Sequence, residues 1–276
     1  MSDTLVIVPT YNEVENLTAI TRRVLAATDR ADILVVDDNS PDGTGSLADV
    51  LAAGSPRIHI LHRETKSGLG DAYRAGFAWG LERSYSVLVE MDGDGSHRPE
   101  QLPALLAGLE TADVVVGSRW VAGGGAPNWA LRRSLLSRGG SFYARCALGL
   151  PFRDVTGGYR VYRATALRAV DYSTARAQGY CFQIEMLWRA WEAGLVISES
   201  PIQFAERTAG QSKMGVAIVV EAITRVTGWG IRNLPRRFAR RARPRATASL
   251  LTDANSSHGT PLHGGLAAAH RLNGSH

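Results

Sequence analysis

Residues 85–99 read YSVLVEMDGDGSHRP. An apolar run, residues 87–89 together with Met91, ends abruptly in two carboxylates, Asp92 and Asp94, which alternate with glycines. The pattern predicts a buried strand that delivers both acids to a surface loop. Carboxylate oxygens suit hard divalent cations such as Mg2+ or Mn2+, and glycines allow the tight backbone that brings two side chains onto one ion. Because acidic turns also follow many strands without binding metal, the rest of the chain has to supply the context.

Similar apolar runs lie on both sides of this stretch, and segments with helical periodicity separate them. After the first run, for example, Asn12 is expected to cap a helix in which Val14, Leu17 and Ile20 fall on one face. Strands that alternate with helices at this spacing predict an α/β fold, with a mostly parallel, Rossmann-like central sheet flanked by helices. The strands predicted before residue 120 are residues 4–8, 33–36, 58–61, 87–91 and 114–116.

Polar side chains gather where these strands end. In parallel sheets, ligands bind outside the carboxyl ends of the strands. A single acid at such a place is an ordinary turn or cap residue, but an accumulation on one edge predicts a functional face. The residues concerned are Tyr11, Asn12 and Glu13, then Asp37 and Asp38, then Asp92 and Asp94, and finally Arg119.

After residue 120 the pattern changes. We expect the glycine pair at 139 and 140 to interrupt the first helix of this half, and Pro201 to mark an edge strand. The predicted elements are, in order, a glycine loop at 123–125, a helix over 129–148, a turn and strand in 156–163, a helix that ends at Gly194, a strand over 197–204 and an amphipathic helix over 214–232.

The net charge belongs to the end of the chain. The formal charge is +5 and the isoelectric point is near 9.5, but seven arginines and a single acid lie from Arg236 onward. Residues 1–232 are therefore predicted to form a nearly neutral catalytic domain, and residues 233–276 a basic, largely disordered tail. A neutral domain with few aromatics among the basic residues argues against nucleic-acid binding.

The termini and the cysteines suggest a location. The N-terminal residues MSDTLVIVPTYNE contain no positive leader and only a short apolar run, so we expect neither a signal peptide nor a membrane span. The two cysteines, Cys146 and Cys181, have no metal-ligand spacing and are predicted to be buried reduced thiols.

Near an anionic cytoplasmic leaflet each arginine contributes about 1 kcal/mol, so the tail and the amphipathic helix favour peripheral association with the inner face of the cell membrane.

The predicted face also carries cations, which are Lys66, Arg119, Arg133, Arg207 and Lys213. Together with a metal-binding carboxylate pair they suit a phosphate-containing substrate, because the ion can take up charge that develops on a leaving diphosphate. The chain has no P-loop, no Ser-His-Asp pattern and no zinc spacing. Metal-assisted phosphate chemistry is therefore what the residues favour.

These motifs resemble the inverting family 2 glycosyltransferases. Within that family the chain is similar to the dolichol- and polyprenol-phosphate mannose synthases, including the bacterial polyprenol monophosphomannose synthases, from residue 4 to about residue 232. The resemblance implies a glycosyltransferase-A fold, GDP-mannose as donor and a polyprenyl phosphate as acceptor. The stretches that carry it are VPTYNE (8–13), VVDDNSPDGT (35–44), KSGLGDAYRAGF (66–77), MDGDGSHRPEQLP (91–103), GSRW (117–120), TGGYRVYR (156–163), FQIEM (182–186) and SKMG (212–215).

The resemblance also implies roles for individual residues. The metal, Mg2+ or Mn2+, is expected on Asp92 and Asp94, with Ser96 as an undecided third ligand because relatives carry Ser or Gln at this position. Arg119, Arg133 and Ser137 are expected to bind the acceptor phosphate, and Asp92, Asp94, Arg119 and Arg133 to carry catalysis. The expected donor-binding residues are Pro9, Tyr11, Glu13, Val36, Asp38, Asp92, Gly93 and Asp94, with Arg207 and Lys213 closing over the diphosphate from a mobile loop.

Several alternatives remain open from sequence. A related family 2 enzyme could use UDP-glucose or UDP-GlcNAc. GLGDAYRAG follows a strand, as a dinucleotide-binding oxidoreductase would require, but it lacks the third glycine of that motif. A non-catalytic lipid- or nucleotide-binding module is a further alternative. A membrane partner, such as an acyltransferase, is compatible with the sequence but not indicated by it.

Three more polar residues have a structural alternative. Glu185 lies in an apolar helix and is interpreted, from the residues alone, as a buried carboxylate paired with an arginine. Asp154 fits a turn residue as well as a functional one. His97, beside Asp94, is expected to be a solvated loop histidine, because the metal of a glycosyltransferase prefers oxygen ligands.

Overall fold

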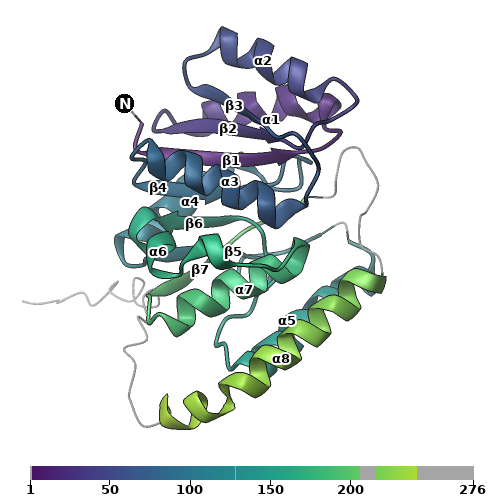
Figure 1. Cartoon of the computed structure of the whole chain (residues 1–276), viewed down its shortest axis with the longest axis vertical. Coiled ribbons are helices and arrows are strands. Elements are labelled where there is room, and N and C mark those ends of the chain that lie inside the picture. The colour runs from purple at the N-terminus through teal and green to yellow at the C-terminus, as the bar shows by residue number, and fades with distance from the viewer. Residues whose placement is uncertain (1, 128, 206–215, 241–276) are drawn as a thin grey trace, which may run out of the picture. The chain divides into compact units, whose positions relative to one another are not determined.

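Seven strands form one mixed sheet in the part of the chain that the computed structural model describes, which is residues 2–127, 129–205 and 216–240. The strand order is β3-β2-β1-β4-β6-β5-β7 (Figure 1). The predicted strands are all present, and each differs from its expected range by only a few residues. They are β1 (Thr4–Thr10), β2 (Ala31–Asp37), β3 (Ile58–His62), β4 (Val87–Glu90), β5 (Val114–Ser118), β6 (Arg160–Arg163) and β7 (Ile197–Pro201).

Most neighbouring strands are parallel, as the alternation of strands and helices predicts. β1 pairs in parallel with β2 and β4, β2 with β3, and β5 with β7. β6 differs, because it runs antiparallel between β4 and β5. The strand that contains Pro201 lies at the edge of the sheet, where a missing backbone N–H breaks no ladder.

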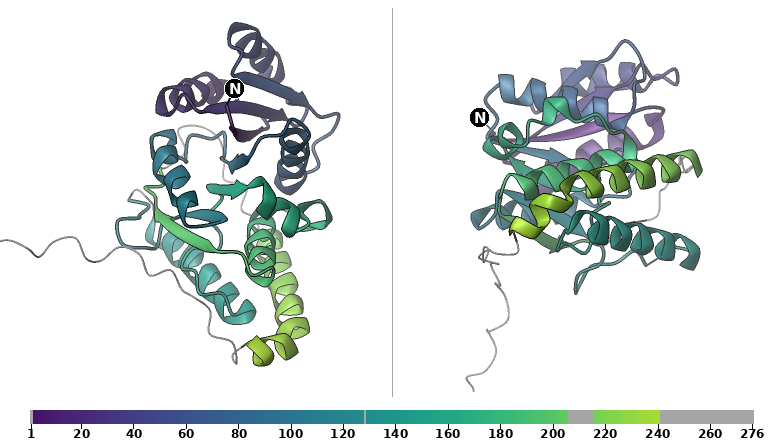
Figure 2. Two further views of the ribbon diagram at one scale, coloured as in Figure 1. Left: turned by 90° about the vertical axis from the view of Figure 1, so that its left-hand side faces the viewer. Right: turned by 60° about the horizontal axis from the view of Figure 1, so that its bottom comes forward.

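Helices cover both faces of the sheet (Figures 1 and 2). Side chains of β1 alternate between two cores: Val6 and Val8 pack with α1, α2 and α4, whereas Leu5 and Ile7 pack with α3, α6 and α7. Burial on both faces explains why these strands are continuous apolar runs. The helices are α1 (Val14–Ala27), α2 (Thr44–Gly54), α3 (Leu69–Glu82), α4 (Leu102–Ala107), α5 (Leu131–Leu148), α6 (Ala164–Ala169), α7 (Gly179–Glu192) and α8 (Val216–Arg240), with short 3-10 turns η1 (Pro99–Gln101), η2 (Gly108–Glu110) and η3 (Tyr172–Thr174).

A third core joins the last helices to the sheet. α8 packs against α5 and α7, and the indole rings of Trp188 and Trp229 stack with their centroids 5.6 Å apart. Val226 is buried in this core. Figure 2 shows α5 and α8 side by side along their length. Within the described segments, no helix combines the length and the apolar character that a membrane crossing requires.

Four expectations about the local structure need correction. α5 runs without a break through Gly139 and Gly140, where a Cβ atom would meet nothing within 4 Å, so the exposed pair costs stability but does not end the helix. Asn12 does not cap α1, because it adopts a left-handed φ of 60° and Glu13 takes the cap position. Cys181 is buried but Cys146 is exposed.

The fourth correction concerns the end of the last helix. α8 extends to Arg240, past the boundary expected at residue 232. Residues 233–240 are therefore helical, whereas the rest of the predicted tail lies outside the described residues.

The close contact between α3 and β1 leads to a stability prediction. A Cβ atom on Gly76 would lie 2.5 Å from Cγ2 of Ile7, so Gly76→Val should lower the free energy of unfolding. We expect about 1–3 kcal/mol, the usual cost of overpacking a core. Gly139→Ala is the matched control, since it fills open space in an exposed helix and should stabilise the protein by about 0.5–1 kcal/mol. Urea denaturation measures the free energy of unfolding of both variants. A Gly76→Val variant as stable as the wild type would contradict the close contact between Gly76 on α3 and Ile7 on β1.

Candidate active site

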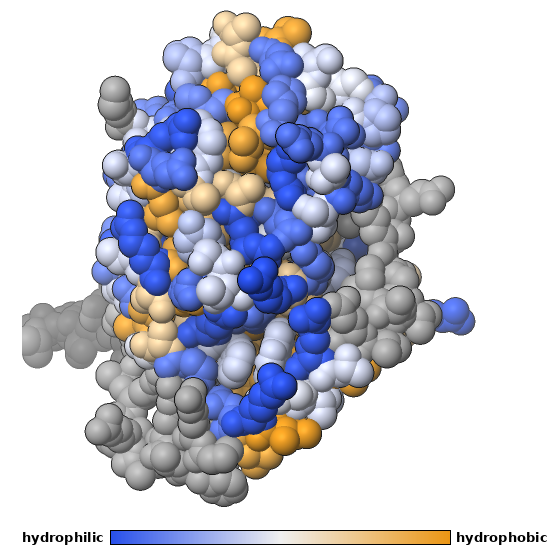
Figure 3. Space-filling view, viewed as in Figure 1, coloured by the Kyte–Doolittle hydropathy of each residue, from blue (hydrophilic) through white to orange (hydrophobic). Residues whose placement is uncertain are grey.

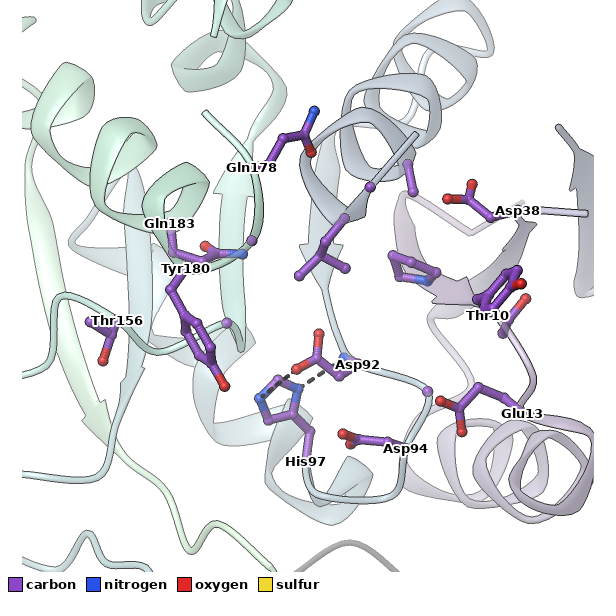
Figure 4. Close-up of a pocket in the computed structure, with 18 of the residues that line it drawn as sticks. Thr10, Glu13, Asp38, Asp92, Asp94, His97, Thr156, Gln178, Tyr180 and Gln183 are labelled. Atoms are coloured by element: carbon purple, nitrogen blue, oxygen red, sulfur yellow. Dashed lines mark hydrogen bonds and ion pairs between the residues drawn. The ribbon is translucent and has the colours of Figure 1, made fainter. Parts of the chain in front are cut away.

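A cavity of about 360 Å³ opens at the carboxyl ends of the strands (Figure 4). The pairing of β1 with β2 and β4 places the polar strand ends beside one another, as the sequence predicts. Two of the predicted residues line it from segments that come later in the chain than β4, Arg119 after β5 and Arg133 on α5. The predicted residues that line the cavity are Pro9, Tyr11, Glu13, Asp38, Lys66, Asp92, Gly93, Asp94, Arg119 and Arg133.

Several predicted residues in the described part of the chain do not line this cavity. Val36 is fully buried in the core between β2 and α3, so its side chain does not reach the cavity. Ser137 is half-buried on α5 outside the lining. Arg207 and Lys213 lie outside the described residues. Their assigned roles stay predictions.

One end of the cavity is formed by residues that follow β1, β2 and β3. Asp38 is 5% exposed, and its Oδ1 accepts a hydrogen bond of 2.6 Å from Nη1 of Arg63. Burial raises the pKa of Asp38 above its usual value although the Arg63 charge acts in the opposite direction. The ammonium of Lys66 lies 3.6 Å from the centroid of the Tyr11 ring. This end therefore combines an aromatic face with a held carboxyl group.

The two acids after β4 lie in the middle of the cavity lining, and hydrogen bonds orient both of them. The hydroxyl of Tyr73, which is fully buried on α3, donates to Oδ1 of Asp92 over 3.1 Å. Burial and the Asp92 charge raise the pKa of Tyr73 well above its usual value, so the phenol keeps its proton and remains a donor. Oδ1 of Asp94 accepts from the backbone N–H of Ser96 over 3.0 Å and from its hydroxyl over 2.5 Å.

Ser96 therefore supports Asp94 in this structure. Its side chain is fully buried and does not line the cavity, so direct ligation of a metal by Ser96 stays a prediction. Glycines keep this loop tight: Gly95 has a φ of 76°, and a Cβ atom on Gly93 would lie 3.2 Å from Val8. Replacing either glycine would move one of the acids.

His97 is not the solvated loop residue that the sequence suggests. It is 1% exposed, stacks on Tyr159 and meets Phe204 edge to face. Its Nδ1 accepts the backbone N–H of Asp92 over 2.9 Å, so the neutral ring carries its proton on Nε2, which lies 3.9 Å from Oδ2 of Asp92 (Figure 4). Burial lowers the pKa of His97, against the charges of Asp92 and Asp94. The expectation failed because nothing in the local sequence of a loop reveals that segments far away in the chain bury it.

The donor set fits a divalent cation that is bound together with a substrate. In the described segments no group of three or more His, Cys, Asp or Glu side chains is placed to hold a metal ion alone. Asp92 and Asp94 nevertheless line one cavity and offer hard oxygen donors. Mg2+ is commonly bound by one or two carboxylates plus substrate phosphates, so a diphosphate can complete such a site.

The far side of the cavity is cationic but partly neutralised. Arg119 is 4% exposed, and its Nε and Nη2 donate to the two carboxylate oxygens of Asp154 over 2.7 Å each. Burial alone would lower the pKa of Arg119, but the charge of Asp154, its hydrogen bond and the other nearby negative charges together outweigh burial and raise that pKa. The guanidinium of Arg133 lies 4.0 Å from the centroid of the Trp129 ring. Asp154, which fitted either a turn or a functional residue, is thus the partner of Arg119.

Glu185 has the structural role that its apolar helix suggests. Its Oε1 accepts from Nη2 of Arg189 over 2.7 Å, and its Oε2 accepts the backbone N–H groups of Arg176 and Ala177. It does not line the cavity. It instead holds the segment that leads into Gln178, Gly179 and Tyr180, which do.

Comparison with known proteins identifies the family. The family model for "Glycosyl transferase family 2" matches residues 5–171. The chain belongs to glycosyl transferase family 2. It is 55% identical over 227 residues to an undecaprenyl-phosphate mannosyltransferase of Micrococcus luteus, which covers 82% of this chain and 93% of the relative. It is 53% identical over 231 residues to a polyprenol monophosphomannose synthase of Mycolicibacterium smegmatis, which covers 83% of this chain and 87% of the relative.

Solved glycosyltransferase structures share the fold. A glucosyl-3-phosphoglycerate synthase from Mycobacterium tuberculosis, solved with Mn2+ and UDP, superposes with a TM-score of 0.56 at 20% identity, covering 85% of this chain and 79% of that one. A mannosyltransferase from Pyrobaculum calidifontis, solved with GDP-Man and Mn2+, gives 0.54 at 16% identity, covering 85% and 64%. This family 2 member is therefore an enzyme of the glycosyltransferase-A fold. The dinucleotide-binding oxidoreductase alternative loses its support.

The buried pair in this glycosyltransferase gives a second prediction. Asp154→Asn leaves the Arg119 charge buried without its partner and should destabilise the protein by about 3–5 kcal/mol near pH 7. Arg119 lowers the pKa of Asp154 although burial acts in the opposite direction. A carboxylate with a lowered pKa adds stability above its unfolded pKa, near 3.8, and loses it as the pH falls through the folded value.

Urea denaturation between about pH 2 and pH 8 tests this. The stability difference between wild type and Asp154→Asn should stay constant above pH 5 and shrink below about pH 4. The double variant Arg119→Met/Asp154→Leu should recover part of the loss, because it removes both charges. A difference that grows as the pH falls would contradict the assigned pair.

Proposed function

We propose that this enzyme transfers mannose from GDP-mannose to a polyprenyl monophosphate, with inversion, to give polyprenyl phosphate β-mannose and GDP. The observation that carries the proposal is the identity of 55% and 53%, over more than four fifths of the chain, with the two polyprenol-linked mannosyltransferases named above. The GDP-Man complex of the Pyrobaculum calidifontis mannosyltransferase supports the choice of donor at the level of the fold.

The nucleoside of the donor fits the end of the cavity that contains Asp38. A held carboxylate accepts hydrogen bonds from the N–H groups of guanine or from ribose hydroxyls. Arg63 fixes its orientation, and Tyr11 offers an aromatic face to the base. Pro9 and Glu13 complete this part of the lining.

The diphosphate then lies beside Asp92 and Asp94, which would hold Mg2+ or Mn2+. The bound ion would offset the negative charge that develops on the leaving GDP. Tyr73 and Ser96 keep the two carboxylates in place through the hydrogen bonds described above. Arg207 and Lys213 are proposed to approach the diphosphate from the segment that the structure does not describe.

The acceptor phosphate needs positioning more than activation. A phosphate monoester has a second pKa of about 6, so at neutral pH an oxygen can attack the anomeric carbon without a strong general base. Arg119 and Arg133 line the cavity on the side of α5 and can orient that phosphate. Because Asp154 neutralises much of the Arg119 charge, Arg133 supplies most of the net attraction. Attack from the face opposite GDP inverts the α-linked mannose.

A reconstituted reaction tests the function. Purified protein, GDP-mannose, polyprenyl phosphate and Mg2+ should yield a mannosyl phospholipid, detected by mass spectrometry of the lipid fraction and absent when EDTA is added. Asp94→Asn should lower turnover at least 100-fold while the circular dichroism spectrum is unchanged, because loss of one carboxylate disrupts the metal site. Glu110→Gln is the matched control, since this exposed acid lies in η2 away from the cavity and should leave turnover unaltered.

Transfer rates measured with GDP-mannose, UDP-glucose and UDP-GlcNAc distinguish the possible sugar donors. Faster transfer from UDP-glucose or UDP-GlcNAc than from GDP-mannose would overturn the proposed donor. A folded Asp94→Asn variant with full activity would refute the metal assignment.

We further propose that the enzyme docks peripherally on the anionic inner face of the cell membrane through α5 and α8. Leu131, Leu135 and Phe142 on α5 are 73%, 60% and 65% exposed, and the helix contains no acid. Figure 3 shows apolar surface over α8, where Ile231 is 62% exposed. Arginines alternate with these apolar residues along α5, and one of them, Arg133, lines the cavity. A bilayer at this surface would bring a lipid phosphate to the acceptor side of the site.

Vesicle flotation tests the docking surface. Leu135→Glu/Phe142→Glu should reduce binding to phosphatidylglycerol vesicles at least tenfold, because two acids on the docking face oppose both apolar contact and charge attraction. Val50→Glu, at an equally exposed apolar position on α2, should have no effect. A chain that ends at residue 235, and so lacks all seven tail arginines, reports on the tail separately. Equal binding by the double variant and the wild type would rule out α5.

A further inference from the structure

Gln183 presents a buried carboxamide to the cavity. The residue lies on α7, is 2% exposed and lines the cavity wall. In the described part of the chain neither Oε1 nor Nε2 of this side chain has a hydrogen-bond partner. Its backbone carbonyl accepts a 2.6 Å hydrogen bond from Nη1 of Arg160, so the residue rests on a fixed backbone. A buried amide without partners is costly, which points to a ligand that supplies them.

The neighbouring acid does not satisfy this amide. Glu90 is fully buried at the end of β4, and burial raises its pKa to about 8, although the Arg160 charge and the Gln183 amide act in the opposite direction. The amide lies near this carboxyl group, but among the described residues neither oxygen of Glu90 has a partner in hydrogen-bond geometry, so the contact leaves the amide available to a ligand. The cavity is therefore where Gln183 can find its partners.

The position of Gln183 along the cavity suggests the ligand. Figure 4 shows Asp38 at one end, Asp92 in the middle, and Gln183 with Tyr180 at the other end. A nucleotide sugar has its nucleoside, diphosphate and hexose in the same order. With the nucleoside at Asp38 and the diphosphate at Asp92, the hexose reaches the wall that Thr156, Tyr180 and Gln183 form.

We propose that Gln183 hydrogen-bonds the hydroxyl groups of the transferred hexose and thereby contributes to the choice of sugar. The proposal rests on the function proposed above, because that function places the diphosphate at Asp92 and Asp94. A carboxamide both donates and accepts, and so does each sugar hydroxyl, so one amide can bind two adjacent hydroxyls. A site that hydrogen-bonds a hydroxyl rejects a sugar that lacks it or holds it in another orientation, because the protein group is then left unpaired.

Calorimetric titration in the presence of Mn2+ tests this with Gln183→Met, which keeps the length of the side chain and removes its hydrogen bonds. Affinity for GDP-mannose should fall about tenfold, or ~1.4 kcal/mol, while affinity for GDP stays unchanged. The preference for GDP-mannose over GDP-glucose should narrow. Gln101→Met is the matched control: the amide of Gln101 accepts the backbone N–H of Gln203 outside the cavity, and this variant should bind both ligands as the wild type does.

Equal losses for GDP and GDP-mannose, or no loss for either, would overturn the inference. Circular dichroism checks folding, and Gln183→Leu, of similar size, replaces the methionine variant if that one does not fold. A wrong donor assignment in the proposed function would be seen differently, because the wild type would then bind another nucleotide sugar more tightly than GDP-mannose. In that case the affinities of wild type and Gln183→Met are compared for that nucleotide sugar and for its nucleoside diphosphate.

Discussion

Parallel pairing of β1 with β2 and β4 is the constraint on which the site depends. The register aligns Thr10 with Asp37 and Ile7 with Glu90, so the segments that follow these strands emerge side by side. Since all three strands point the same way, their loops must share one edge of the sheet. Asp92 and Asp94 after β4 and Asp38 after β2 therefore line one cavity. The pairing of the strands brings them together, so their loops need not contact one another.

Around this edge, buried partners hold the polar groups in place. Arg63 holds Asp38, Tyr73 holds Asp92, and Asp154 holds Arg119. The charges of Asp38 and Arg119 are buried, so each is stable only with its partner present. The same burial raises the pKa of Asp38 and Tyr73 and lowers that of His97. The cavity is thus lined by groups whose orientations are set before a substrate binds.

Most of the fold could be predicted from local patterns. Continuous apolar runs specify strands that are buried on both faces, and the alternation along β1 matches the two cores that form. Local patterns failed where distant packing decides: Gly139 and Gly140 continue a helix, and the antiparallel direction of β6 has no local cause. Local sequence does not reveal the burial of His97 for the same reason, because Tyr159 and Phe204, which bury it, are far away in the sequence.

The candidate site also has features that the local sequence predicts and features that only the tertiary structure shows. By itself the sequence determined the strand ends that carry Tyr11, Asp38, Asp92, Asp94 and Arg119, since a strand and the loop after it are encoded by neighbouring residues. Only the tertiary structure decided that Tyr73 is a hydrogen-bond donor to Asp92, that Asp154 pairs with Arg119, and that Gln183 faces the cavity. A tyrosine or a glutamine on an apolar helix looks the same in sequence whether it meets the core or a carboxylate. The difference arises only when the helix packs on the sheet, because that contact joins residues with no local relation.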